Sequence, residues 1–198
     1  MKTEELTFTD EENVKIFCYK WTPDGQADYK GVVQISHGMA EISARYERLA
    51  SVLTSAGYAV YANDHRGHGR TALLLDNIGY PGDRDGFSWM VRDMYQLSNI
   101  IKEENPGVPL FLLGHSMGSF LSQRYIQLYG DEIDGLVLSG TNGKQGIALD
   151  IGILIARLEI KMRGRRAKSP TLNSLCFGSF NKSFRPSKTE FDWLSSDS

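Results

Sequence analysis

The chain has 198 residues, of which 41% are hydrophobic and 23% are charged, and its formal net charge is -2 at pH 7. This balance is typical of a globular protein with one substantial core, and a slightly negative chain has no long-range attraction for nucleic acid. Because aromatic and basic residues do not interleave along any predicted strand, we expect no nucleic acid partner.

The N-terminal residues 1–13 are polar and acidic, and they lack the basic start and apolar centre of a signal peptide. The sequence contains no run of about eighteen apolar residues, so we expect no membrane-spanning helix. Cys18 and Cys176 lie far apart and fit no metal or redox spacing, which favours reduced thiols. Together these features predict a cytoplasmic protein.

Two β-rich runs, at residues 6–9 and 14–21, come first and predict a hairpin or two neighbouring antiparallel strands. Apolar runs at 31–36 and 58–63 predict buried strands. Between them, residues 42–57 carry apolar side chains at helical spacing.

After a loop rich in Gly and Asp (64–87), Ser88 is expected to cap a helix that ends at Asn105. The pattern continues with a strand, a helix and a strand at 109–113, 116–130 and 133–140. Strands that are apolar throughout and alternate with amphipathic helices favour a parallel sheet covered on both faces. The predicted fold is therefore α/β, doubly wound, with a mostly parallel sheet.

Beyond Gly140 the alternation stops: residues 146–164 predict a long amphipathic helix, and residues 165–198 are loop-like. We therefore divide the chain into a core with six strands (1–140) and the beginning of a cap, or lid (141–198).

The predicted cap helix has an apolar face and a basic end. The apolar face carries Ile147, Ile151, Leu154, Leu158 and Met162, and the basic cluster comprises Lys161, Arg163, Arg165, Arg166 and Lys168. We expect the apolar face to form a wall of an acyl site, and the basic cluster could meet anionic headgroups. Cations near a helix C-terminus are favourable in any case, and the sequence favours this purely structural role for the cluster.

The sequence GHSMG, residues 114–118, lies between a predicted apolar strand and a predicted helix. A tight turn there would lift the hydroxyl of Ser116 above the carboxyl edge of the sheet, where it could act as a nucleophile. Glycine is required at positions 114 and 118 for a steric reason, because strand and helix approach closely at this turn and a side chain there would collide. The alternative is a glycine-rich turn with an incidental serine.

The sequence HGMAE, residues 37–41, follows another predicted strand. Acyl transfer needs two backbone N–H groups aimed at the developing oxyanion, one after the nucleophile and one from this earlier loop. Met117 and Met39 are the candidates. The alternative is that His37 and Gly38 simply make a turn.

The sequence NDHRGHGR, residues 63–70, places two histidines beside an aspartate and so raises a metal site as a possibility. We discount a metal, because the chain's remaining histidines lie in turns already assigned and supply no further ligand. We expect instead a glycine-rich loop in which Asp64 pairs with Arg66 and shapes the floor of the site. Dinucleotide-binding and P-loop motifs follow no predicted strand, so no nucleotide cofactor is expected.

These motifs together resemble those of the α/β-hydrolase superfamily, specifically its monoacylglycerol lipase and lysophospholipase-like branch, which includes the serine aminopeptidase S33-type hydrolases. The resemblance rests on HGMAE followed by RYERLA, on DHRGHGR, on GHSMG and on FDWLS at 191–195, and it spans nearly the whole chain. Two positions depart from it: Ile42 stands where relatives commonly have His, and Ser119 where a small residue, often Gly, follows the serine turn.

The resemblance implies Ser116 as nucleophile, the backbone N–H groups of Met39 and Met117 as oxyanion hole, and no cofactor or metal. It also implies a cap, inserted after the sixth strand, that selects a lipid-like ester and could make peripheral contact with a membrane.

In this superfamily the catalytic acid and histidine follow the nucleophile in chain order. None of the four histidines follows Ser116. We therefore expect the acid and histidine of the triad to be absent from these 198 residues, the C-terminal strands to be missing, and the chain alone to be inactive. The free edge of the sheet is expected to pair with a complementary C-terminal segment or in an oligomer.

Two hypotheses of function remain. In the first, the protein is a serine hydrolase that cleaves carboxylic esters, of monoacylglycerol or lysophospholipid type, through an acyl-enzyme on Ser116. In the second, it is a non-catalytic protein of the same fold that binds a ligand or partner. A reading frame that continued past residue 198 into an Asp turn and a His loop would favour the first.

Overall fold

The computed structural model describes residues 1–25, 28–73, 77–143 and 146–178. The chain forms two compact units, Met1–Asn142 and Gly143–Ser198. Among the described residues, six strands lie in the first unit and two helices in the second.

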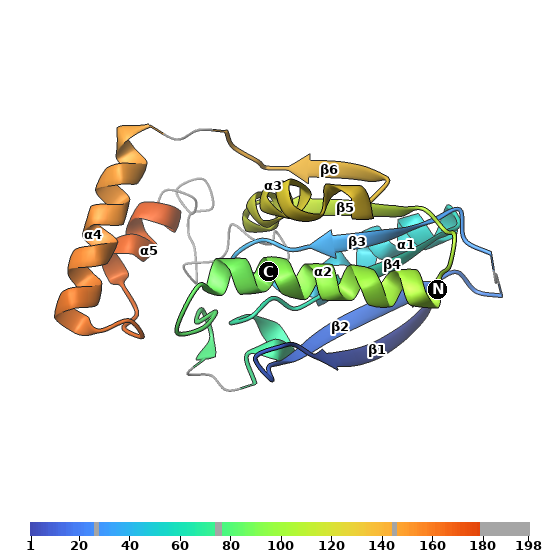
Figure 1. The fold of residues 1–198 in the computed structure, drawn as a ribbon, viewed down its shortest axis with the longest axis horizontal. Coiled ribbons are helices and arrows are strands. Elements are labelled where there is room, and N and C mark those ends of the chain that lie inside the picture. Colours follow the sequence, from blue (N-terminus) through green and yellow to red (C-terminus); the bar gives the residue numbers. More distant parts are fainter. Residues whose placement is uncertain (26–27, 74–76, 144–145, 179–198) are drawn as a thin grey trace, which may run out of the picture. The chain divides into compact units, whose positions relative to one another are not determined.

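The first unit is built on one mixed sheet whose strand order is β1-β2-β4-β3-β5-β6 (Figure 1). The strands are β1 (Lys2–Thr9), β2 (Lys15–Thr22), β3 (Gly31–Ser36), β4 (Tyr58–Asn63), β5 (Leu110–His115) and β6 (Gly135–Ser139). β1 pairs antiparallel with β2, and β2 with β4, whereas β3 to β6 are joined by parallel pairings. The predicted antiparallel start and mostly parallel sheet are confirmed.

Alternate residues of the central strands face two separate apolar layers. Val32, Tyr61 and Leu110 pack with α2 (Gly86–Glu104), and Leu112 packs with both α2 and α3 (Met117–Tyr129). Their chain neighbours pack on the other side around α1 (Glu47–Ser55), with Ile35 and Val60 fully buried there. Every residue of β3 is buried, as expected for a strand covered on both faces.

Two helix boundaries differ from those the sequence predicts. α2 begins at Gly86, after Asp85 in a left-handed conformation (φ 48°), so Ser88 lies inside the first turn and is not the cap. A short 3₁₀ helix, Ser43–Tyr46, precedes α1 in the segment predicted as one continuous helix.

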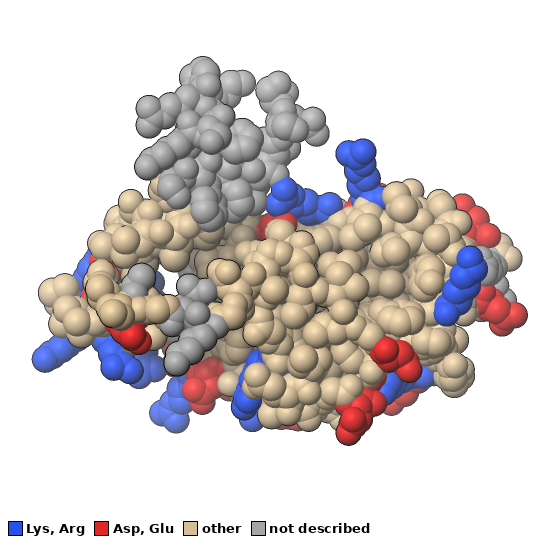
Figure 2. All heavy atoms as spheres, turned by 90° about the horizontal axis from the view of Figure 1, so that it is seen from above, with Lys and Arg blue, Asp and Glu red and all other residues tan. Residues whose placement is uncertain are grey.

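The outer edge of β6 has no partner strand among the described residues. Val137 on this strand is 55% exposed, and Phe120 and Leu128 on the neighbouring α3 are also exposed. Figure 2 looks down on this side of the first unit and shows a largely uncharged surface with acidic and basic residues toward its margins. This edge carries the unpaired backbone groups that can recruit another strand.

The second unit contains α4 (Ile147–Arg163) and α5 (Pro170–Phe177). α4 is the predicted amphipathic helix, and Ile147, Leu154 and Met162 on it are 77%, 56% and 74% exposed. α5 corrects the expectation of a loop: Ser169 is its N-cap, accepting a hydrogen bond from the Leu172 N–H at 2.9 Å, and Pro170 occupies its first turn. The predicted FDWLS motif at 191–195 lies outside the described residues. In the described part of the chain, no helix has the length and apolar character needed to cross a bilayer.

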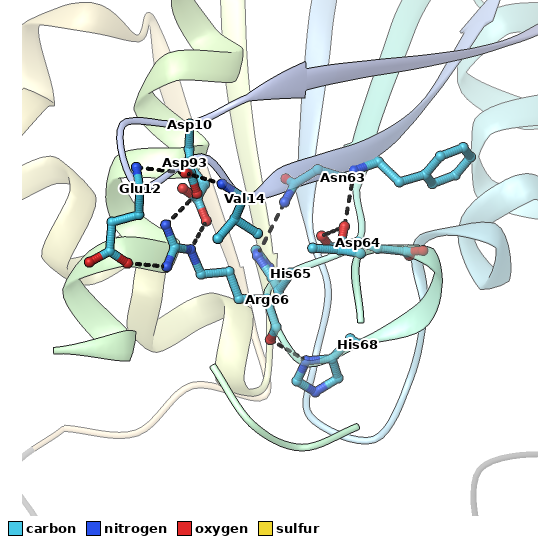
Figure 3. A network of polar contacts seen from close by, with 11 residues as sticks. Asp10, Glu12, Val14, Asn63, Asp64, His65, Arg66, His68 and Asp93 are labelled. Atoms are coloured by element: carbon cyan, nitrogen blue, oxygen red, sulfur yellow. Dashed lines mark hydrogen bonds and ion pairs between the residues drawn. The ribbon is translucent and has the colours of Figure 1, made fainter. Parts of the chain in front are cut away.

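The expectation that Asp64 pairs with Arg66 is wrong. Arg66 is buried and forms ion pairs with Glu12 at 2.6 Å, with Asp93 at 3.0 Å and with Asp10 (Figure 3). Its guanidinium also lies 4.9 Å from the ring centroid of Trp89. The arginine therefore ties the loop after β4 to the β1–β2 turn and to α2, on the side of the loop away from Asp64.

Asp64 is instead an acceptor for backbone and hydroxyl donors. One carboxylate oxygen accepts from the N–H and the hydroxyl of Ser43, at 2.8 and 2.6 Å, and the other accepts from the Arg70 N–H at 2.8 Å. A Cβ on Gly69 would come within 2.1 Å of this carboxylate, so only glycine fits there. Asp64 thus closes the glycine-rich loop onto the segment that precedes α1.

Asp93 is the most deeply buried carboxyl of the Arg66 cluster. Its side chain is 1% exposed, and within the described part of the chain its Oδ1 atom receives no hydrogen bond. Burial raises the pKa of Asp93 to about 7, although the nearby Arg66 acts in the opposite direction.

Replacing Asp93 by Asn should change how stability depends on pH. In wild type the folded carboxyl holds its proton up to pH about 7, whereas in the unfolded chain it loses that proton near pH 4, so its stabilising contribution is complete below pH about 4 and is lost as pH rises through about 7. Asn does not titrate. The free energy of unfolding of Asp93→Asn relative to wild type should therefore rise between these limits, by at most about 1.4 kcal/mol per pH unit. Urea unfolding from pH 5 to 8 measures this difference, and parallel profiles for the two proteins would contradict it.

Candidate active site

Ser116 lies in a strained turn between β5 and α3. Its backbone has φ 51° and ψ -117°, a conformation that non-glycine residues rarely adopt. The Ser116 N–H donates to the carbonyl of Ser139 at 2.9 Å, which ties the turn to the end of β6. The Ser116 carbonyl accepts from the Ser119 N–H at 2.9 Å and from its hydroxyl at 2.6 Å. Both sides of the strained residue are therefore fixed.

The two glycines of this turn are required by close backbone contacts. A Cβ on Gly114 would lie 2.5 Å from the Gly118 carbonyl oxygen. A Cβ on Gly118 would lie 2.0 Å from the carbonyl oxygen of Ser36, at the end of β3. The structure therefore supports the steric reason that the sequence suggests for both positions.

The segment His37–Glu41 lies against this turn. A Cβ on Gly38 would be 3.2 Å from the Cβ of Ser116, so the Gly38 backbone stands directly beside the serine. The Gly38 N–H donates to the carboxylate of Glu41, which also accepts from the Tyr46 hydroxyl at 2.8 Å and from Arg45 at 2.8 Å. These side-chain bonds hold the loop that connects β3 to the 3₁₀ helix Ser43–Tyr46.

The N–H groups of Met39 and Met117 donate no hydrogen bond to any described residue. Met117 begins α3, where the first N–H groups of a helix lack partners inside the helix and carry partial positive charge. Met39 follows Gly38 in the loop beside Ser116. Backbone N–H groups without an acceptor can, as a general rule, stabilise a negatively charged oxygen.

Within the described part of the chain, no hydrogen bond joins the Ser116 hydroxyl to any of the four histidines, and each histidine has another contact. Both ring nitrogens of His37 are engaged, Nδ1 with the Gly38 carbonyl at 2.7 Å and Nε2 with the His65 N–H at 3.0 Å. His65 contacts the Ser36 hydroxyl at 2.9 Å, His68 contacts the Arg66 carbonyl at 3.0 Å, and His115 contacts the Ser139 hydroxyl at 3.2 Å.

Three of these histidines form a cluster under the loops. The ring centroids of His37 and His65 are 4.3 Å apart, and those of His37 and His68 are 5.2 Å apart. Burial lowers the pKa of all three, that of His37 to about 4, so the rings are neutral at pH 7. Among the described residues, no group of three or more His, Cys, Asp or Glu side chains is placed to hold a metal ion.

Sequence reasoning missed two participants in this arrangement. Glu41 had no assigned role, although an acidic side chain three residues after a glycine in a loop can accept that glycine's N–H, much as in a helix capping box. The sequence predicts Ser139 only as the end of a strand. Its bond to Ser116 depends on the pairing of β5 with β6, which the sequence around either residue does not encode.

A cavity of about 530 Å³ lies elsewhere, between the β1–β2 turn and the outer side of α2. Its walls include Asp10, Trp89, Tyr95 and Tyr129, and it contains neither Ser116 nor the HGMAE loop. It therefore adds nothing to the candidate active site.

Comparison with curated proteins finds relatives that include two lipases of known name. The chain is 38% identical over 146 residues to the monoacylglycerol lipase of Mycolicibacterium smegmatis, which covers 73% of this chain and 49% of that protein. It is also 38% identical over 110 residues to the monoglyceride lipase of Homo sapiens, covering 54% of this chain and 33% of that protein. The chain thus spans half or less of the length of each relative.

Solved structures give a consistent result. A thermostable carboxyl esterase from Bacillus coagulans, in complex with glycerol, matches with a TM-score of 0.82 and 33% identity over 100% of this chain and 63% of that chain. A soluble variant of monoglyceride lipase from Saccharomyces cerevisiae, in complex with a substrate analogue, matches with a TM-score of 0.63 and 25% identity over 82% and 53% of the two chains.

The family model described as serine aminopeptidase, S33, matches residues 27–198, a range that contains Ser116, the HGMAE loop and all strands from β3 onward. The sequence motifs, the six-stranded sheet and the structural neighbours agree with this match. The chain therefore belongs to the serine aminopeptidase S33 family of α/β-hydrolases and is similar to its monoglyceride lipases.

Proposed function

We propose that the protein is a serine hydrolase that cleaves carboxylic esters of lipid-like substrates, of the monoacylglycerol or lysophospholipid type. The observation that carries this proposal is the strained Ser116, which Met117 follows and beside which Gly38 lies, together with N–H groups of Met39 and Met117 that have no acceptor among the described residues. The resemblance to monoacylglycerol lipases and to a carboxyl esterase supports an ester as the substrate.

In the proposed reaction the Ser116 hydroxyl oxygen attacks the ester carbonyl carbon while a base takes the hydroxyl proton. Negative charge develops on the carbonyl oxygen, where the Met39 and Met117 N–H groups stabilise it. Collapse of this intermediate expels the alcohol, which receives the proton, and leaves an acyl-enzyme on Ser116. Water then attacks the acyl carbonyl and releases the fatty acid. No step of this scheme requires a cofactor.

We propose that the histidine and acid of the triad come from sequence other than these 198 residues. His37 and His65 use their ring nitrogens in structural hydrogen bonds, and no histidine follows Ser116. A complementary C-terminal segment that paired with the free edge of β6 could bring such groups to Ser116, and an oligomeric contact is the alternative cover for that edge. A cytoplasmic location remains a prediction of the sequence.

The competing proposal is a non-catalytic protein of the same fold that binds a ligand or partner. It differs from the first in one measurable respect, since it needs neither the hydroxyl of Ser116 nor a base. The following predictions separate the two.

Replacing Ser116 by Ala should reduce ester hydrolysis by at least about a thousandfold in the protein translated from its complete gene, because the nucleophilic oxygen is lost. The exposed Ser55 on α1 offers a matched control, and Ser55→Ala should retain wild-type activity. Initial rates with p-nitrophenyl and monoacylglycerol esters, together with circular dichroism of each variant, provide the measurement. Activity of Ser116→Ala within a few fold of wild type would show that Ser116 is only a turn residue.

The 198-residue chain expressed alone should hydrolyse p-nitrophenyl esters no faster than its Ser116→Ala variant. A serine hydroxyl is a weak nucleophile until a base within hydrogen-bond reach takes its proton, and the four histidines present are placed in other contacts. A folded 198-residue monomer that showed burst kinetics would overturn this expectation and require one of these histidines to move.

The second unit is proposed to contact membranes peripherally. α4 exposes Ile147, Leu154 and Met162, and basic residues surround its C-terminal end. Apolar helix faces with nearby Lys and Arg bind anionic lipid surfaces, each cation contributing about 1 kcal/mol close to the surface.

Reversing the charge of Lys161, Arg163 and Lys168 together to Glu should weaken sedimentation with vesicles of anionic lipid by more than about tenfold. Reversal of Lys15, Arg48 and Arg124, which are exposed on the first unit, changes the net charge equally and should have little effect. Equal vesicle binding by both triple variants and wild type would show that the basic cluster only stabilises the C-terminal end of the helix.

A further inference from the structure

The peptide bond that joins Gly38 to Met39 is held by the imidazole of His37. The Gly38 carbonyl oxygen lies 2.7 Å from Nδ1 of His37, and the opposite ring nitrogen, Nε2, lies 3.0 Å from the backbone nitrogen of His65. The ring is completely buried between the two loops that follow β3 and β4. His37 thus links the two loops, and it also forms a hydrogen bond with the peptide unit between Gly38 and Met39.

The hydrogen bonds determine the tautomer of this ring. A backbone N–H can only donate, so Nε2 of His37 must accept from His65 and carry no proton. In a neutral ring the proton is then on Nδ1, which donates to the Gly38 carbonyl. Burial lowers the pKa of His37 to about 4, so the neutral form is the one present at pH 7.

Fixing the Gly38 carbonyl fixes the direction of the next N–H. The peptide unit is planar and trans, so the Met39 N–H points opposite to the Gly38 carbonyl, away from the imidazole. The preceding peptide is held independently, because its Gly38 N–H donates to Glu41. Two successive peptide planes in the loop beside Ser116 are therefore each held by a side chain.

We propose that His37 is a positioning residue, whose Nδ1–H orients the Gly38–Met39 peptide so that the Met39 N–H faces the oxygen on which negative charge develops. This inference rests on the proposed ester hydrolysis by Ser116. The inference goes further than the proposed function in one respect. The Met39 N–H stabilises the oxyanion only if the His37 side chain orients its peptide, whereas the side chain at position 39 has no part in this.

Two substitutions separate the two hydrogen bonds of His37. Asn places its amide N–H₂ near the position of Nδ1, so His37→Asn keeps the donor to Gly38 and loses the acceptor for His65. Gln places its amide oxygen near the position of Nε2, so His37→Gln keeps that acceptor and loses the donor. Both variants lose the ring contact with His65, which makes each a control for the other's loss of packing.

The kinetic test uses the protein translated from its complete gene. In His37→Gln, kcat for a p-nitrophenyl ester should fall roughly ten- to hundredfold with little change in KM, because an interaction made only in the transition state is weakened; complete removal of one oxyanion donor costs about 10²- to 10³-fold. In His37→Asn, kcat should stay within about threefold of wild type. Equal losses in the two variants, or a loss confined to KM, would show that His37 serves only packing.

A measurement on wild type covers the case in which a variant fails to fold. Long-range ¹H–¹⁵N NMR correlations of the His37 ring should show Nδ1 protonated and Nε2 unprotonated at pH 7, and the opposite tautomer would overturn the inference. The outcomes also distinguish it from the proposed function. If the wild-type protein hydrolyses no ester, the proposed function fails, whereas hydrolysis abolished by Ser116→Ala but unaffected by His37→Gln contradicts only the role of His37.

Discussion

The arrangement depends on the strained backbone of Ser116, which only close contacts from other strands can hold. A sparsely populated conformation with positive φ costs a residue with a Cβ of the order of 1–3 kcal/mol and persists where the surroundings leave no alternative. Here α3 approaches β3 so closely that Gly118 touches the Ser36 carbonyl, and the Ser116 N–H is fixed by Ser139 at the end of β6. The serine side chain is therefore presented by contacts between strands far apart in the sequence.

The parallel pairing of β3, β4, β5 and β6 explains why these groups meet. Parallel strands end at the same edge of a sheet, so the loops that follow them converge there. Side chains help to hold these loops: Glu41 and His37 fix the first loop, and Asp64 closes the second. The histidines among them are neutral because they are buried, and this lets them act as directional donors and acceptors.

Much of this fold can be predicted from local sequence, because strand composition and turn glycines are read from neighbouring residues. Strands such as 31–36 and 58–63 are mostly apolar and are buried on both faces, and the glycines of the Ser116 turn lie two residues from it in the chain. The partner of Arg66 could not be deduced in this way. Asp64 is two residues away in sequence, but the guanidinium turns to Asp10 and Asp93, which only the tertiary fold brings near. The helix α5 had a recognisable signal, Ser169 followed by Pro170, that apolar periodicity alone does not detect.

The central claim is that Ser116 is the residue that forms a covalent bond with substrate. Its most direct test is treatment of the protein from the complete gene with a fluorophosphonate, followed by peptide mass mapping. The account predicts a single stoichiometric adduct on the peptide that contains Ser116, formed by the folded protein and absent after denaturation. Labelling of another residue, or no labelling of a folded protein that hydrolyses esters, would contradict it.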